Sequence, residues 1–198
     1  AKIALQDLKS VYIDLNDINA YASYVNSIGG NIRLEVGEQD SLTYIAAEKL
    51  FMRGDNDGAR RSLINYLQTF PEGAFSSNAN FYLGSIAFAK KEFDEAIQRF
   101  KSVIASGDTK FLEESVARTA EIEYLSKDYP AALESFKRLQ IVAENPENRQ
   151  AARLGIMRCA LQTGQQKDAL LAADELLKEP KLSPELEAEA RYVRAKAY

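Results

Sequence analysis

Two groups of neighbouring carboxylates are the residues whose types and spacing could support chemistry. Glu113 and Glu114 are adjacent, and Glu121 and Glu123 follow a few residues later. Paired carboxylates can serve as general acid and general base. The sequence has no histidine, the commonest general base, and no nucleophile motif lies near these residues. We therefore interpret the four carboxylates as a solvated helix face and predict no enzymatic activity.

The other reactive residue types favour structural roles. Cys159 is the only cysteine, which excludes an internal disulfide and a zinc site built from cysteines. It lies in an apolar stretch, so we expect a buried small side chain rather than a reactive thiol. The glycines at Gly54 and Gly58 lack the Lys-Ser/Thr ending of a phosphate-binding loop. We predict no catalytic residue, no cofactor and no metal site.

Composition is that of an ordinary folded protein. Apolar residues make up 46% of the 198 residues and charged residues 27%, which argues against disorder. The formal net charge of −4 argues against general nucleic-acid binding, which needs concentrated positive charge. No apolar run approaches the roughly 18 residues of a membrane span. We expect a protein or peptide partner and no nucleic acid.

Residues 80–105 show the clearest form of a pattern that recurs along the chain. They predict two helices joined by a tight turn. The first helix carries Leu83 and Gly84, and the second carries Ala96 four residues before Phe100. A small residue in the middle of an apolar stripe lets two helices approach closely. The stretch therefore predicts a helix-turn-helix unit.

An alanine marks the same place in four successive units. The spacings are 96−59=37, 132−96=36 and 169−132=37. A repeated register of this length is typical of a solenoid, in which each unit packs on its neighbours. We predict four repeats, at residues 41–73, 77–108, 111–146 and 147–180, within a repeat region that spans 41–182.

The remaining segments flank these repeats. Residues 1–30 predict a degenerate helical repeat whose second helix runs over 18–28, capped by Asp17. Residues 31–40 alternate apolar and polar side chains, so they form either a short strand or, as we favour, a surface loop. Residues 183–198 predict the first helix of a further repeat. We expect the chain to be an internal piece of a longer solenoid.

The Leu-Gly pair, followed by aromatic-x-x-Ala-x-x-x-aromatic, resembles the tetratricopeptide repeat. The resemblance is best in the second repeat and weaker in the first, which has Ala46 and Ala47 in place of Leu-Gly. It implies an all-α fold, a right-handed superhelix whose concave face is lined mainly by the first helices. The family repeat is about 34 residues long, so these units are two or three residues longer.

The family's groove positions can be transferred to this sequence through the key alanines. Chaperone-binding members of the family place lysine and asparagine there to clamp a carboxylate, but this chain has Tyr44 and Phe81 instead, with Glu114 and Glu121 nearby. An apolar or aromatic peptide with basic residues suits this lining better. The alternative is that Tyr44, Phe81 and Tyr124 pack against neighbouring helices or the 31–40 loop. The implied groove residues are Ser41, Tyr44, Glu48, Phe51, Asn78, Phe81, Ser85, Phe88, Glu114, Ala117, Glu121, Tyr124, Ala151, Leu154, Arg158 and Leu161.

Residues 65–104 are similar to bacterial cell-envelope repeat proteins, namely the periplasmic proteins coordinated with the Tol–Pal system and the lipoproteins of outer-membrane protein assembly. Residues 1–40 look like larger repeat proteins of Bacteroidetes-type envelopes. The similarity implies a periplasmic or outer-membrane-associated location. It favours a non-catalytic interaction scaffold that binds its partner in the groove. The alternative is a structural spacer within a larger solenoid whose activity lies elsewhere.

Overall fold

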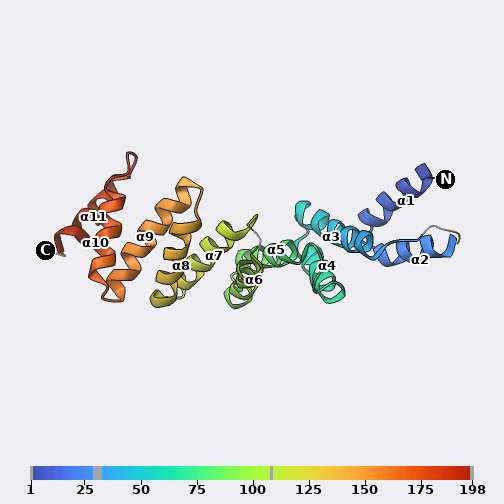
Figure 1. Ribbon diagram of the computed structural model, residues 1–198, viewed down its shortest axis with the longest axis horizontal. Helices are drawn as coiled ribbons and strands as arrows, with labels where there is room; N and C mark the ends of the chain where they lie inside the picture. The colour runs from blue at the N-terminus through green and yellow to red at the C-terminus, as the bar shows by residue number, and fades with distance from the viewer. Residues whose placement is uncertain (1, 29–32, 108, 197–198) are drawn as a thin grey trace. The chain divides into compact units, whose positions relative to one another are not determined.

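The computed structural model describes residues 2–28, 33–107 and 109–196, and within these ranges the secondary structure is helical (Figure 1). This confirms the all-α prediction. None of the described helices has both the length and the apolar character required to cross a membrane. The helices are α1 (Lys2–Asp14), α2 (Ile18–Ile28), α3 (Val36–Met52), α4 (Asn56–Thr69), α5 (Ser76–Ala89), α6 (Phe93–Ser106), α7 (Leu112–Leu125), α8 (Tyr129–Val142), α9 (Pro146–Gln162), α10 (Gln166–Leu176) and α11 (Pro184–Lys196).

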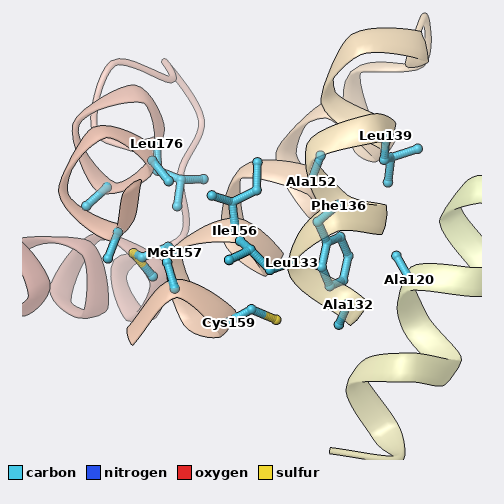
Figure 2. Packing of buried hydrophobic residues seen from close by; sticks show 14 of the residues in the cluster. Ala120, Ala132, Leu133, Phe136, Leu139, Ala152, Ile156, Met157, Cys159 and Leu176 are labelled. Atoms are coloured by element: carbon cyan, nitrogen blue, oxygen red, sulfur yellow. The ribbon is translucent and has the colours of Figure 1, made fainter. Parts of the chain in front are cut away.

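The chain divides into two compact units, residues 1–99 and residues 100–198, here called the first and the second unit. In the first unit, α3 packs on α4 and α4 on α5, while α1 and α2 contact each other and α3. In the second unit, each helix from α7 to α11 packs on the next. Figure 2 shows the second unit's core, where Leu133 and Phe136 of α8 face Ile156 of α9.

One turn geometry recurs five times within the residues that the structure describes. A left-handed residue ends the first helix of each pair, and its N–H donates to the carbonyl three residues earlier. The next N–H donates to the carbonyl five residues earlier, as in Gly54 to Phe51 at 2.9 Å and Asp55 to Leu50 at 3.0 Å. This is the Schellman arrangement, which satisfies the last carbonyls of a helix. The left-handed residues are Asn16, Gly54, Lys91, Lys127 and Gly164.

These turns keep the register that the alanines predict. The last four left-handed residues are spaced by 91−54=37, 127−91=36 and 164−127=37, and each precedes its key alanine by five residues. The four key alanines, Ala59, Ala96, Ala132 and Ala169, are all at most 1% exposed. Asn16 extends the pattern to the chain's first helix pair, where Tyr21 takes the alanine's place and is also buried.

Replacing Ala96 by leucine tests this register. Ala96 is fully buried, so three added carbons must displace neighbours in a close-packed interface. We expect the free energy of unfolding to fall by about 1–3 kcal/mol and the melting temperature to fall with it. Thermal and urea unfolding followed by circular dichroism measure both. Ala89, exposed at the end of α5, provides the control: Ala89→Leu should leave the melting curve nearly unchanged. Equal curves for the two variants would contradict the register.

The segment before the first full repeat differs from its prediction. Residues 31–40 were expected to form a loop or a strand, but α3 begins at Val36, so residues 36–40 are helical. The alternation there does not reflect a buried face, because Val36 is 71% exposed. The helix thus begins five residues before the predicted start at Ser41. Asp40, within this added turn, is buried and accepts a hydrogen bond from the Tyr66 hydroxyl. The predicted helix over residues 18–28 is α2 itself.

Candidate functional site

A groove of about 300 Å³ lies in the second unit, where α7 and α9 flank α8. The two flanking helices are the first helices of the third and fourth predicted repeats. Side chains of α7 and α9 form the walls, and two side chains of α8 form the floor. The lining residues are Glu114, Ala117, Arg118, Glu121, Tyr124, Leu125, Phe136, Leu139, Asn148, Ala151, Leu154, Gly155 and Arg158.

The floor of the groove depends on a glycine. A Cβ placed on Gly155 would lie 2.4 Å from two carbons of the Phe136 ring, closer than real Cβ atoms approach a neighbour. The missing side chain therefore lets the ring lie directly against α9. Tyr124 packs against the same ring, with centroids 6.4 Å apart and planes at 71°, a favourable edge-to-face geometry. The groove consequently has a continuous aromatic and aliphatic base.

Charged side chains line the rim. On α7, Arg118 bonds both Glu114 at 2.8 Å and Glu121 at 3.0 Å. On α9, Arg158 donates two hydrogen bonds of 2.8 Å to the carboxylate of Glu189 in α11. Hydrogen bonding to Glu189 raises the pKa of Arg158 and lowers the pKa of Glu189. The lining itself holds two carboxylates, Glu114 and Glu121, and two guanidinium groups, so its net charge is 2−2=0.

Glu113 joins α7 to the start of α9 at one end of the groove. Its carboxylate accepts hydrogen bonds from the Glu144 N–H at 2.9 Å, the Asn145 N–H at 3.1 Å and the Asn148 amide at 2.7 Å. Burial alone would raise the pKa of Glu113, but the three donors outweigh it and hold the pKa below its ordinary value of 4.5. Because Asn148 lines the groove, Glu113 fixes part of the rim.

This lowered pKa predicts an acid-sensitive contribution to stability. A carboxyl whose pKa is lower in the folded than in the unfolded state stabilises the fold fully above its unfolded pKa. That contribution is lost as the pH falls through the folded pKa. We expect Glu113→Gln to reduce the stability difference between pH 6 and about pH 3. Urea unfolding at several pH values measures this, with the exposed Glu147→Gln as control. Parallel pH profiles for wild type and Glu113→Gln would refute the assignment.

The structure corrects the interpretation of the four carboxylates as one solvated face. Glu121 is exposed, but Glu123 is only 5% exposed. It accepts a hydrogen bond from the Ser135 hydroxyl at 2.5 Å and lies 3.2 Å from the Lys101 ammonium. Glu123 is therefore a buried carboxylate with a hydrogen bond and an ion pair. Glu113 accepts hydrogen bonds from the backbone N–H groups just before α9. No cluster in the described part of the chain has three or more side chains placed to ligate a metal.

The first unit arranges its predicted groove residues differently. Tyr44 is only 2% exposed and stacks on Phe75, with ring centroids 4.4 Å apart. Its hydroxyl donates to Glu48 at 2.7 Å and accepts from the Asn78 amide at 3.1 Å. Tyr44 is therefore a core residue that joins α3 to α5, as the packing alternative proposed. The expectation that it faces a ligand was wrong, because the register places it beneath the loop before α5.

The other predicted positions of the first unit are half-buried on α3 and α5. Phe51 packs against Tyr82 with centroids 4.6 Å apart, and Phe81 meets the same ring edge-on at 5.7 Å. The Ser85 hydroxyl donates to the Phe81 carbonyl one turn earlier, at 2.9 Å. Ser41 likewise donates to its own helix, at 2.9 Å to the Gly37 carbonyl. Each of the two serine hydroxyls thus donates to a carbonyl of its own helix, whereas the aromatic side chains pack against one another.

Within the second unit, the register brings most of its predicted residues together. Those that line the groove are Glu114, Ala117, Glu121, Tyr124, Ala151, Leu154 and Arg158. Leu161 is half-buried and does not line it. Sequence reasoning missed the floor. Phe136 lies four residues after the key alanine Ala132, and the small residue opposite it, Gly155, is the signal that could have indicated an accessible ring.

Comparison with known proteins identifies the architecture. Residues 46–109 match the tetratricopeptide repeat family. The chain has a tetratricopeptide-repeat fold. It resembles the crystal structure of the MamA protein at 18% identity, with a TM-score of 0.59 over 82% of this chain and 87% of that one. The MamA AMB-1 structure gives 15% identity and a TM-score of 0.61, over 94% and 96%.

A Podospora anserina protein with nearly identical TPR-like repeats also resembles the chain. Its TM-score is 0.51 at 14% identity, over 98% of this chain and 94% of that one. The comparison with curated proteins finds no match. At these identities, the tetratricopeptide-repeat structures define the fold and leave the function to be inferred from the groove.

Proposed function

We propose that this chain is a non-catalytic scaffold that holds an extended segment of a partner protein in the groove of the second unit. The observation that carries the proposal is the groove itself. It has an apolar floor at Phe136 and Leu139, and its charged lining consists of two carboxylates, Glu114 and Glu121, and two guanidinium groups, Arg118 and Arg158. An apolar side chain of the partner would enter over Phe136. A neighbouring basic residue would be attracted by the rim carboxylates.

The dimensions of the groove suit one or two side chains rather than a whole domain. A volume of about 300 Å³ is at the lower end of the range for small-ligand pockets. Aromatic anchors in well-packed pockets supply much of the binding energy at protein interfaces. The floor supplies such a pocket without rearrangement, since Gly155 already leaves the Phe136 ring in place. These features favour short linear recognition.

Crosslinked affinity capture from the source cell tests this function. One bait is the native protein, and a second carries Tyr124→Ser and Leu154→Ser, two changes in the groove walls. The control bait carries Ile141→Ser, because Ile141 is 84% exposed on α8 outside the groove. Circular dichroism first establishes that all three fold. We expect a partner that the native and control baits retain and the groove variant loses.

A structural spacer is the second candidate. Its groove would tolerate polar substitutions, because its role would be to set a distance between other domains. Identical partners on all three folded baits would overturn the groove proposal and support the spacer. Each helix from α7 to α11 packs on the next, which supports this alternative, because such packing would hold the ends of the unit at a fixed distance.

We also propose that the protein acts in a bacterial cell envelope, in the periplasm or at the outer membrane. The support is the similarity of residues 65–104 to envelope repeat proteins. Fractionation of the source cell, followed by immunoblotting of the soluble, periplasmic and membrane fractions, tests the location. Recovery in the cytoplasmic fraction alone would refute the location and leave the groove proposal intact.

A further inference from the structure

Glu48 on α3 is a carboxylate held in place by neutral groups. The Tyr44 hydroxyl donates to its Oε1 at 2.7 Å, and the Tyr82 hydroxyl donates to the same oxygen at 3.1 Å. Glu48 forms no ion pair within the ranges that the structure describes. Other carboxylates of the first unit are neutralised by cations, as Asp14 is by Lys49 at 3.0 Å and Arg53 at 2.9 Å. Glu48 therefore keeps its negative charge uncompensated.

The two tyrosines form a rigid support for this carboxylate. Tyr44 and Tyr82 are 2% and 8% exposed. Burial, assisted by the hydrogen bond to Glu48, raises the pKa of Tyr44. Burial and the negative charge of Glu48 raise the pKa of Tyr82. Both hydroxyls consequently remain protonated donors, and Oε1 is occupied. A ligand that meets Glu48 would pay little side-chain ordering entropy.

The second carboxylate oxygen is open. Glu48 is half-buried, and its Oε2 does not belong to the buried polar atoms that lack a partner in the described residues. It forms no hydrogen bond there, so Oε2 faces solvent. One oxygen is thus fixed by the protein and the other is free to accept a donor from outside.

Aromatic rings flank Tyr82, one of the two residues that donate to Glu48. Phe51 lies three residues after Glu48 on α3, and residues three apart are neighbours on a helix surface. The ring of Phe51 contacts the ring of Tyr82, which donates to Glu48, and Phe81 contacts the Tyr82 ring edge-on. The faces of such rings attract cations through their quadrupole. Carboxylate and rings therefore favour the same kind of ligand.

We propose that Glu48, with Phe51 and Phe81, binds a lysine side chain of a partner peptide. Charge complementarity supplies the attraction, and the rings receive the methylene stem and the ammonium. Lysine fits better than arginine because only Oε2 is open. A guanidinium owes its advantage to two parallel hydrogen bonds with both carboxylate oxygens. The site belongs to the first unit and stands independently of the groove in the second.

A titration with the smallest suitable probe tests the site. The probe is Nα-acetyl-lysine-N-methylamide, added to the full chain while nuclear magnetic resonance follows the ring signals of Phe51, Phe81 and Tyr82. The norleucine analogue keeps the apolar stem without the charge, and the arginine analogue tests the headgroup. Glu48→Gln keeps the shape and the acceptor for both tyrosines but removes the charge. Glu72→Gln, at an exposed position of the same unit, is the matched control.

We expect the lysine probe to shift the three rings saturably, in the wild type and in Glu72→Gln alike. Glu48→Gln should weaken the binding at least about fivefold, which is a typical effect for a charge-assisted bond. Norleucine should produce no saturable shift. Equal binding by Glu48→Gln, or by norleucine, would overturn the proposal. Tighter binding of the arginine probe would overturn the choice of lysine. Because no probe involves the second unit, failure here leaves the groove proposal untouched.

Discussion

Replacing Asp40 by alanine is expected to lower the free energy of unfolding of the first unit by about 2–4 kcal/mol. Asp40 is 8% exposed and accepts hydrogen bonds from the Tyr66 hydroxyl at 2.6 Å and the Ala74 N–H at 2.9 Å. The Tyr66 hydroxyl in turn accepts from the Phe75 N–H at 3.0 Å. The substitution leaves the buried Tyr66 hydroxyl and the part-buried Ala74 N–H without their acceptor, and it releases the loop that leads into α5.

Urea unfolding followed by circular dichroism and by tyrosine fluorescence measures this loss. Glu72→Ala is the control, because Glu72 is an exposed carboxylate in the same loop. Gly73→Ala should resemble Asp40→Ala, since a Cβ at Gly73 would lie 2.4 Å from the Tyr66 hydroxyl oxygen and 3.0 Å from Asp40 Oδ1. If Asp40→Ala and Glu72→Ala unfold at the same urea concentration, the buried network contributes nothing and the account is wrong.

Replacing Gly155 by valine is expected to destabilise the second unit by about 3 kcal/mol, the upper end of the usual range for overpacking. Two effects oppose each other. Valine is a better helix former than glycine by roughly half a kcal/mol. The new Cβ, however, would meet the Phe136 ring at 2.4 Å, and the ring fills the space between α8 and α9. The steric effect dominates because a ring face cannot yield as the end of a flexible chain can.

The companion variant Phe136→Leu isolates this contact. By itself it should destabilise the unit, since it removes part of a buried ring. Combined with Gly155→Val it should cost less than the sum of the two single changes, because leucine leaves room for the new side chain. Urea unfolding of the four proteins completes the cycle. Strictly additive losses would show that Gly155 and Phe136 do not constrain each other.

Sequence reasoning predicted the helical architecture through spacing alone. The alanines at positions 59, 96, 132 and 169 carry helix contacts that admit only a small side chain, so their register survives where other positions vary. Seven residues of the groove were implied by the resemblance to the tetratricopeptide repeat, whose groove positions were transferred through the same register. The register rests on local periodicity, which a sequence displays directly, whereas the groove positions rest on the family resemblance.

What the sequence could not reveal are the contacts between distant segments. Asp40 was placed in a loop because nothing near it indicates that Tyr66 and Ala74 would satisfy its carboxylate. Tyr44 was expected in a groove, but the stacked ring of Phe75 covers it. Glu123 was expected in solvent, but it is buried, where Ser135 donates a hydrogen bond to its carboxylate and Lys101 forms an ion pair with it. Each error concerns a polar side chain whose partner lies outside its own helix.

The recurring left-handed turn also bears on how such a chain changes during evolution. The same two backbone hydrogen bonds form whether the left-handed residue is glycine, lysine or asparagine. A turn that does not depend on one side chain permits wide drift in sequence while the backbone course stays the same. Duplication or loss of a whole repeat would preserve it as well. The same turn accordingly occurs outside the residues that match the family, at residue 16 and again at residue 164, while the match covers residues 46–109.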